Sequence, residues 1–244
     1  MLAAAALAAS DASAQRPVVR VYDVRITGVM NASYFERRTC SDRHPKTTMR
    51  SSTRHTWSSV HRGVLLTFGT GRIGRFDIGG GSVQHGRLTR SVRYQDDGLS
   101  CTSLPPCRFE RTHVVPSVFQ VSPLGLHLGQ YIMGFNVAAA SPAGIDTGDA
   151  CGGQYAPEVQ DRGIDVTRSR KGSRHRIVHS TWLYTSVSTY TRTRPSAATL
   201  PYPFDLLYAG KPVAIRVTDT KDESRLSESS VGTLTIVFQP RRSR

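Results

Sequence analysis

The sequence has 244 residues, with 32 lysine and arginine residues against 18 aspartate and glutamate residues, a formal net charge of +14. This length allows one large domain or two small ones. No segment stays apolar over the roughly 20 residues that a helix needs to cross a bilayer, so no transmembrane helix is expected. The charge favours anionic surfaces, but it concerns solubility and non-specific attraction rather than a defined site.

The N-terminal segment is short and apolar. Residues 2–9 are all alanine or leucine, and Ala12-Ser13-Ala14, followed by Gln15, has the small-x-small pattern that a signal peptidase accepts. We therefore expect residues 1–14 to be a signal peptide and residues 15–244 to form an exported domain, secreted or held in the cell envelope. No lysine or arginine precedes the apolar run, so the true start could lie upstream of Met1, and the alternative is a frayed alanine-rich tail.

Alternating apolar and polar residues predict a succession of β-strands. In chain order they cover residues 18–27 continued by 31–37, 54–68 as one strand or two, 88–94, 108–115, the apolar region 118–137, 176–193, 212–219 and 233–239. Segment 176–193 lacks glycine and proline and is rich in Thr, Ser, Val and Tyr, so one long strand is expected there. The last two strands are expected to pair antiparallel, joined by a charged, Ser-rich hairpin loop at 220–230.

No stretch carries a helical apolar stripe with capping residues, so the sequence predicts an all-β fold, an antiparallel sandwich or open barrel with long loops. Loops are expected at residues 41–52, 79–82, 96–106, 138–163 and 193–203. The small, Gly-rich segment 141–153 allows a weak domain boundary near residues 140–160. We favour a single domain, because one of the cysteine pairs that we favour would cross that boundary.

The four cysteines, an even number, agree with export to an oxidising compartment. Three pairings are open. We favour Cys101–Cys107, which closes a tight loop, and Cys40–Cys151 as a long-range disulfide. In the chain-entropy model a loop of about 100 residues stabilises the fold by roughly 4–5 kcal/mol, and the short loop by about half as much.

A glycine-rich motif follows the apolar segment 64–68. Gly69-Thr70-Gly71-Arg72-Ile73-Gly74 resembles the dinucleotide-binding fingerprint of nicotinamide-dependent dehydrogenases, in which the glycines open a helix that holds pyrophosphate. Here the triple glycine at residues 79–81 disfavours such a helix, and no acid stands about 20 residues beyond the strand. We therefore expect a glycine-rich turn and no cofactor.

A second short motif, Asp146-Thr147-Gly148, resembles the signature of aspartic proteases. That chemistry needs two carboxylates that share a proton, and the chain has no second such triplet. A turn is the favoured interpretation.

The segment Cys151-Gly152-Gly153 resembles the nucleophile turn of chymotrypsin-like cysteine proteases, in which backbone amides stabilise an oxyanion. That family has a glycine two residues before the cysteine, where this chain has Asp149. His55, His61 and His113 lie upstream, as the family order requires, but none stands in a recognisable motif. We expect Cys151 to be structural, and no catalytic residue is assigned.

His175 and His179 have the spacing of zinc ligands on a helix. In a strand the two residues lie about 13 Å apart, too far for a shared zinc ion. Because this segment is predicted to be a strand, no metal site is expected.

Twenty-eight of the 32 basic residues are arginine, which can bind phosphate or carboxylate with two parallel hydrogen bonds. A G+C-rich genome explains the choice of arginine over lysine, but not the net charge. The sequence is typical of many exported bacterial proteins and favours a non-catalytic β domain that binds anionic surface polymers or lipid headgroups weakly and with strong salt dependence. The alternatives are a secreted hydrolase with loop-borne catalytic residues and, less favoured, a nucleic-acid binder.

Overall fold

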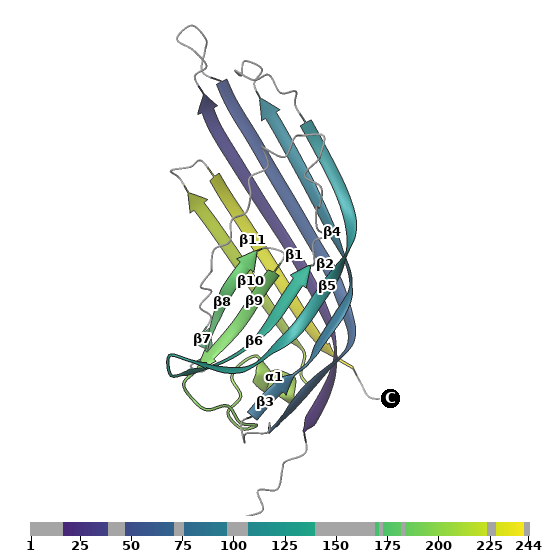
Figure 1. Cartoon of the computed structure of the whole chain (residues 1–244), viewed down its shortest axis with the longest axis vertical. Helices are drawn as coiled ribbons and strands as arrows, with labels where there is room; N and C mark the ends of the chain where they lie inside the picture. The colour runs from purple at the N-terminus through teal and green to yellow at the C-terminus, as the bar shows by residue number, and fades with distance from the viewer. Residues whose placement is uncertain are drawn as a thin grey trace, which may run out of the picture.

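The computed structural model describes residues 17–38, 47–70, 76–96, 107–139, 169–170, 173–181, 184–223 and 228–241. The elements, drawn in Figure 1, are β1 (Val18–Arg38), β2 (Thr47–Thr70), β3 (Phe76–Gly79), β4 (Gly81–Asp96), β5 (Cys107–His127), β6 (Gln130–Ala139), β7 (Ser169–Arg170), β8 (Ser173–Thr181), β9 (Tyr184–Thr191), α1 (Phe204–Tyr208), β10 (Val213–Glu223) and β11 (Glu228–Pro240).

The strands form one antiparallel sheet in the order β10-β11-β1-β2-β4-β5-β6-β9-β8-β7, and β3 pairs with the end of β2. The sheet curls into a half-barrel, with α1 in its hollow (Figure 1). The expected all-β, antiparallel fold is confirmed, and the curled sheet takes the open-barrel form. No helix in the described residues is long and apolar enough to span a membrane.

The two faces of the sheet follow from residue alternation. On β1, Tyr22, Val24 and Ile26 are fully buried, whereas Arg25 and Thr27, which flank Ile26, are exposed. Successive side chains of a strand point to opposite faces, so these residues identify the two surfaces of the sheet. We call the side that carries Tyr22 and contacts α1 the inner face, and the opposite side the outer face.

An aromatic cluster fills the hollow near α1. Phe135 stacks on Phe204 of α1, with ring centroids 4.9 Å apart, and its ring centre lies 5.1 Å from that of Phe238 and 5.9 Å from that of Phe119. The hydroxyl of Tyr22 donates to the backbone carbonyl of Leu207 at 2.8 Å. The five-residue helix is therefore held by burial and by this bond rather than by its own length.

The inner face of β2 changes character along its length. Near α1 it carries the buried apolar residues Val64, Leu66 and Phe68, and further away it carries buried polar residues. These are Ser51, Thr53, Ser59 and His61. A register shift separates the two parts, because Tyr22 pairs with Val64 but Val24 pairs with His61.

Gly63 lies within this register shift, at a φ of +68° that glycine adopts at little cost. Its backbone N–H donates to the Asp23 carboxylate at 2.8 Å. The aromatic core thus lies near one end of the sheet, while the longest strands continue beyond it (Figure 1).

Several strand predictions are confirmed, and others are wrong. The 212–219 and 233–239 strands pair antiparallel as expected, and Leu234, Ile236 and Phe238 share the buried face. The expected loop at 220–230 is instead mostly strand, since β10 continues to Glu223 and β11 begins at Glu228. Likewise, β2 already begins at Thr47, within the loop expected at 41–52.

The prediction of a single strand at 176–193 is also wrong. The segment folds as β8 and β9, which pair with each other, for example Ser180 with Thr185. The expected signal peptide and the possible domain boundary near 140–160 lie outside the described residues.

Candidate anion-binding groove

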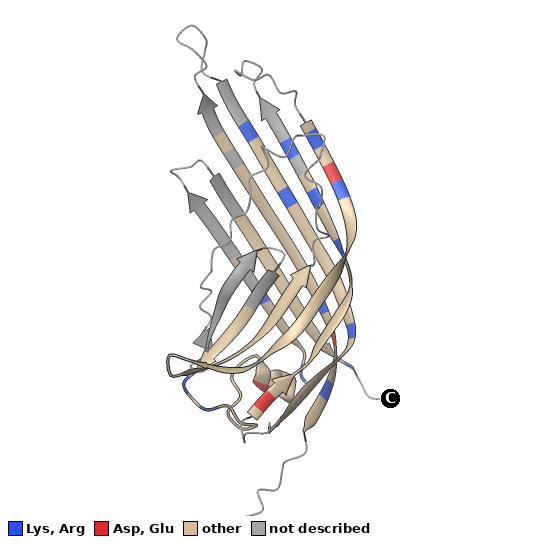
Figure 2. Ribbon diagram, viewed as in Figure 1, with Lys and Arg blue, Asp and Glu red and all other residues tan. Residues whose placement is uncertain are grey.

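Figure 2 shows that lysine and arginine residues gather on β2, β4 and β5 at the end of the sheet away from α1, and the strand register places three arginines there on the outer face. They are Arg54 on β2, Arg93 on β4 and Arg108 on β5. The strand register places Arg93 directly opposite Arg108, and Arg54 directly opposite Ser91. Arg54 and Arg93 are therefore diagonal neighbours on adjacent strands, about 7–8 Å apart at Cα. All three side chains are exposed.

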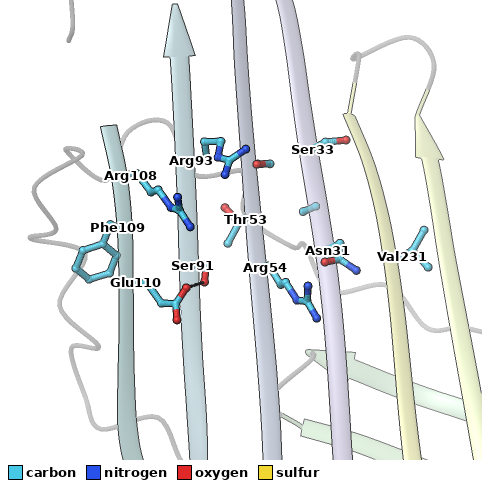
Figure 3. A pocket seen from close by; sticks show the side chains of 12 residues that line it. Asn31, Ser33, Thr53, Arg54, Ser91, Arg93, Arg108, Phe109, Glu110 and Val231 are labelled. Atoms are coloured by element: carbon cyan, nitrogen blue, oxygen red, sulfur yellow. Dashed lines mark hydrogen bonds between the residues drawn. The ribbon is translucent and has the colours of Figure 1, made fainter. Parts of the chain in front are cut away.

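The arginines border a shallow groove of about 500 Å³. Figure 3 shows them over the same stretch of sheet, with short polar side chains between them. The lining residues are Asn31, Ala32, Ser33, Ser52, Thr53, Arg54, Ser91, Arg93, Arg108, Phe109, Glu110 and Val231. Small side chains such as Ser52 and Ser91 leave the floor open between the long guanidinium-bearing side chains.

The groove is electropositive. Its lining holds three arginines and one carboxylate, Glu110, which accepts a hydrogen bond from the Ser91 hydroxyl at 3.0 Å. No ion pair or hydrogen bond joins the guanidinium groups of Arg54, Arg93 or Arg108 to another described residue. Like charges directly opposite on paired strands destabilise a sheet, by up to about 1 kcal/mol. The Arg93–Arg108 pair therefore costs stability in the free protein and would gain from a bound anion.

A further arginine extends the positive surface. Arg50 pairs with Phe35 across β1 and β2, and its guanidinium lies 5.6 Å from the centre of the Phe35 ring. A cation over an aromatic face is attracted to it, and the ring restricts the side chain. The outer face thus places exposed arginine side chains beside hydroxyl groups, both of which can donate hydrogen bonds to an oxyanion.

A second polar cluster lies on the inner face. His61 Nε2 lies 3.1 Å from Ser117 Oγ and 3.4 Å from Ser59 Oγ, and Ser117 donates to Ser59 at 2.8 Å. Serine–histidine contacts of this kind occur in hydrolases. Here His61 and Ser117 are fully buried and Ser59 is 4 % exposed, and the hydroxyls are used within the cluster. A substrate cannot reach them in this structure, so the cluster acts as a hydrogen-bonded part of the core.

The two histidines on the inner face of β2 are held neutral. Burial lowers the pKa of His61, and a backbone hydrogen bond with Ser82 opposes that shift. Burial, together with the charge of Arg90, lowers the pKa of His55 to about 4. Neither imidazole adds to the positive charge near neutral pH.

Two of the sequence motifs lie wholly or partly within the described residues. Gly69 and Thr70 end β2 and pair with Asp77 and Phe76 of β3, so a hairpin stands where a dinucleotide-binding helix would have to begin. His175 and His179 lie in strand β8, as predicted, which rules out helical zinc spacing. Across the part of the chain that is described, no group of three or more potential ligands could hold a metal ion.

The cysteine predictions fall largely outside the described residues, as does the Asp146-Thr147-Gly148 motif. Cys40, Cys101 and Cys151 are among the residues not described. Cys107 begins β5 and is not a free cysteine. The pairings Cys101–Cys107 and Cys40–Cys151, and the structural role of Cys151, stay predictions.

Comparison with protein families, with curated proteins and with solved structures finds no match for this chain. The sequence pointed to anionic partners but to no residue that would bind them. Arg93 and Arg108 stand 15 positions apart, and only the register of β4 on β5 brings them together.

Proposed function

We propose that this protein is an exported, non-catalytic β domain that binds anionic polymers of the cell envelope or its surroundings in the outer-face groove. The observation that carries the proposal is the direct cross-strand pair Arg93–Arg108, with Arg54 beside it and no acid paired to any of the three among the described residues. Natural sheets usually place opposite charges across from each other, so an unneutralised arginine pair favours an external anion.

The scaffold supports binding in two ways. Strands β2, β4 and β5 are paired along this stretch, which fixes the spacing of the arginines before a ligand arrives. The groove is also shallow and open to solvent, so a chain-like ligand can lie across it without threading through a closed pocket. Exposed charges are screened over about 8–10 Å at physiological salt, so affinity from this surface is strongly salt-dependent.

The test compares two double variants with the same change in charge. Arg93→Gln/Arg108→Gln removes the groove pair, and Arg25→Gln/Arg216→Gln removes two exposed arginines on β1 and β10 outside the groove. Binding of dextran sulfate is measured by titration calorimetry between 50 and 500 mM NaCl. We expect the groove variant to lose at least about 10-fold in affinity at 150 mM NaCl, because charge-assisted hydrogen bonds are worth about 1.5–3 kcal/mol each.

The control variant should lose less than about threefold, because it removes only long-range attraction. Equal losses in the two variants would show that net charge, and not the groove, is responsible, and would overturn the proposal.

A further inference from the structure

We infer that the groove selects an oxyanion with three unesterified oxygens over a carboxylate or a phosphodiester. Sulfate esters and phosphate monoesters have three such oxygens. The inference rests on the proposed function and narrows the class of its ligand. It starts from the way in which Arg93 and Arg108 face each other.

Residues directly opposite on antiparallel strands have their Cβ atoms about 4.5–5.5 Å apart. The side chains of Arg93 and Arg108 are long relative to this spacing, so both guanidinium groups can reach one anion placed between them. Each guanidinium is a planar fork that binds two oxygens through parallel hydrogen bonds. A ligand that neutralises the pair therefore has to offer acceptors to two forks at once.

The number of oxygens then separates the candidate anions. A carboxylate has two oxygens, which a single fork occupies, and the second arginine is left with poorly oriented lone pairs. A phosphodiester likewise has two unesterified oxygens. A sulfate ester or phosphate monoester has three, arranged as a tripod. Each fork can therefore bind two oxygens, with one of the three oxygens shared between the two forks.

The neighbours of the pair agree with a compact tripod. Ser52 stands opposite Arg93 on β2, on the side away from Arg108, and is exposed, so it adds a hydroxyl group to the edge of the arginine pair. Glu110 is the next residue of β5 on the same face after Arg108, and its carboxylate is held by Ser91. The negative charge of Glu110 disfavours an anion directly beside it and thus favours one between Arg93 and Arg108.

Arg54 gives the groove a second contact. Arg54 is a diagonal neighbour of Arg93, with its Cα about 7–8 Å away, so its long side chain can contact a second charged group beside the first. The geometry points to a chain that carries repeated monoester groups rather than a single small ion.

The experiment uses one polymer backbone with different anions. Dextran sulfate, phosphorylated dextran and carboxymethyl dextran with equal degrees of substitution are titrated against the protein at 150 mM NaCl, together with single-stranded poly(dT) as a phosphodiester. We expect the sulfated or the phosphorylated dextran to bind at least about 10-fold more tightly per charge than carboxymethyl dextran or poly(dT). The tighter of the two monoesters identifies the source of the anion.

The deciding variant is Arg93→Lys, which keeps the charge but removes the fork. We expect it to reduce the preference for the monoester over carboxymethyl dextran, as a ratio of the two affinities, to within about threefold. Equal binding of all the polymers by the wild type, or a preference that survives Arg93→Lys, would overturn the inference but not the proposed function. Failure of every polymer to bind would overturn both.

Discussion

Gly86 on β4 is a position where a single added methyl group should clash with the neighbouring strand β2. A Cβ atom built there would lie 2.9 Å from the backbone oxygen of Ser58, 3.0 Å from Ser59 Cβ and 3.2 Å from the indole Nε1 of Trp57. The closest of these contacts involves backbone, which cannot rotate away. In Gly86→Ala either β2 shifts away from β4, or Trp57, which is 1 % exposed, leaves its packing site.

Overpacking of this kind costs about 1–3 kcal/mol of unfolding free energy. For a domain of this size that corresponds to about 2–12 °C in melting temperature. Guanidinium unfolding followed by far-ultraviolet circular dichroism measures the change. Gly232→Ala on β11 is the matched control, because its Cβ would meet no atom within 4 Å, and it should be neutral or slightly stabilising. If Gly86→Ala were as stable as Gly232→Ala, the close packing of Trp57 over β4 would be wrong.

Two further changes test the hydrogen bonding and the charge of the inner face. Tyr22→Phe removes the donor to the carbonyl of Leu207 and should lower the unfolding free energy by about 0.5–1.5 kcal/mol, and an unchanged guanidinium midpoint would contradict this role. Because the pKa of His55 is lowered to about 4 by burial and Arg90, the folded protein binds fewer protons than the unfolded chain, so stability is complete above about pH 6.5 and falls toward pH 4. His55→Gln should reduce the decrease in unfolding free energy between pH 7 and pH 4 by up to about 3 kcal/mol. Denaturant unfolding at the two pH values measures this change. An equally steep pH dependence in the variant would argue against a buried neutral imidazole.

The sequence predicted strands best where alternation was strict. Val213, Ile215, Leu234 and Ile236 are all buried as expected, because each stands on one face of a strand covered on that side only. Segment 176–193 contains neither glycine nor proline, so the usual signals for a chain reversal were absent from it. Helix α1 is five residues long and is held by tertiary burial of Phe204 and Leu207, which no local periodicity could reveal.

The candidate groove was beyond the reach of single-sequence reasoning. Arginine is abundant throughout the chain, and no residue near Arg93 or Arg108 distinguishes these two from the others. Their role depends on which residue of β4 faces which residue of β5, and a shift of one position would put them on opposite faces of the sheet. The net charge therefore allows a prediction of the class of partner. The residues that would bind the partner can be identified only from the register of β4 on β5.

The placement of β1 has a consequence for how the chain reaches this fold. β1 comes first among the described strands, yet it lies inside the sheet, hydrogen-bonded to β2 on one side and to β11 on the other. During synthesis its second edge has no partner until residues 228–240 have emerged, and an open edge is a template for pairing with other chains. Contacts between such distant segments form slowly. The half-barrel can be completed only after residues 228–240 have emerged, and until then the free edge of β1 is open to pairing with other chains.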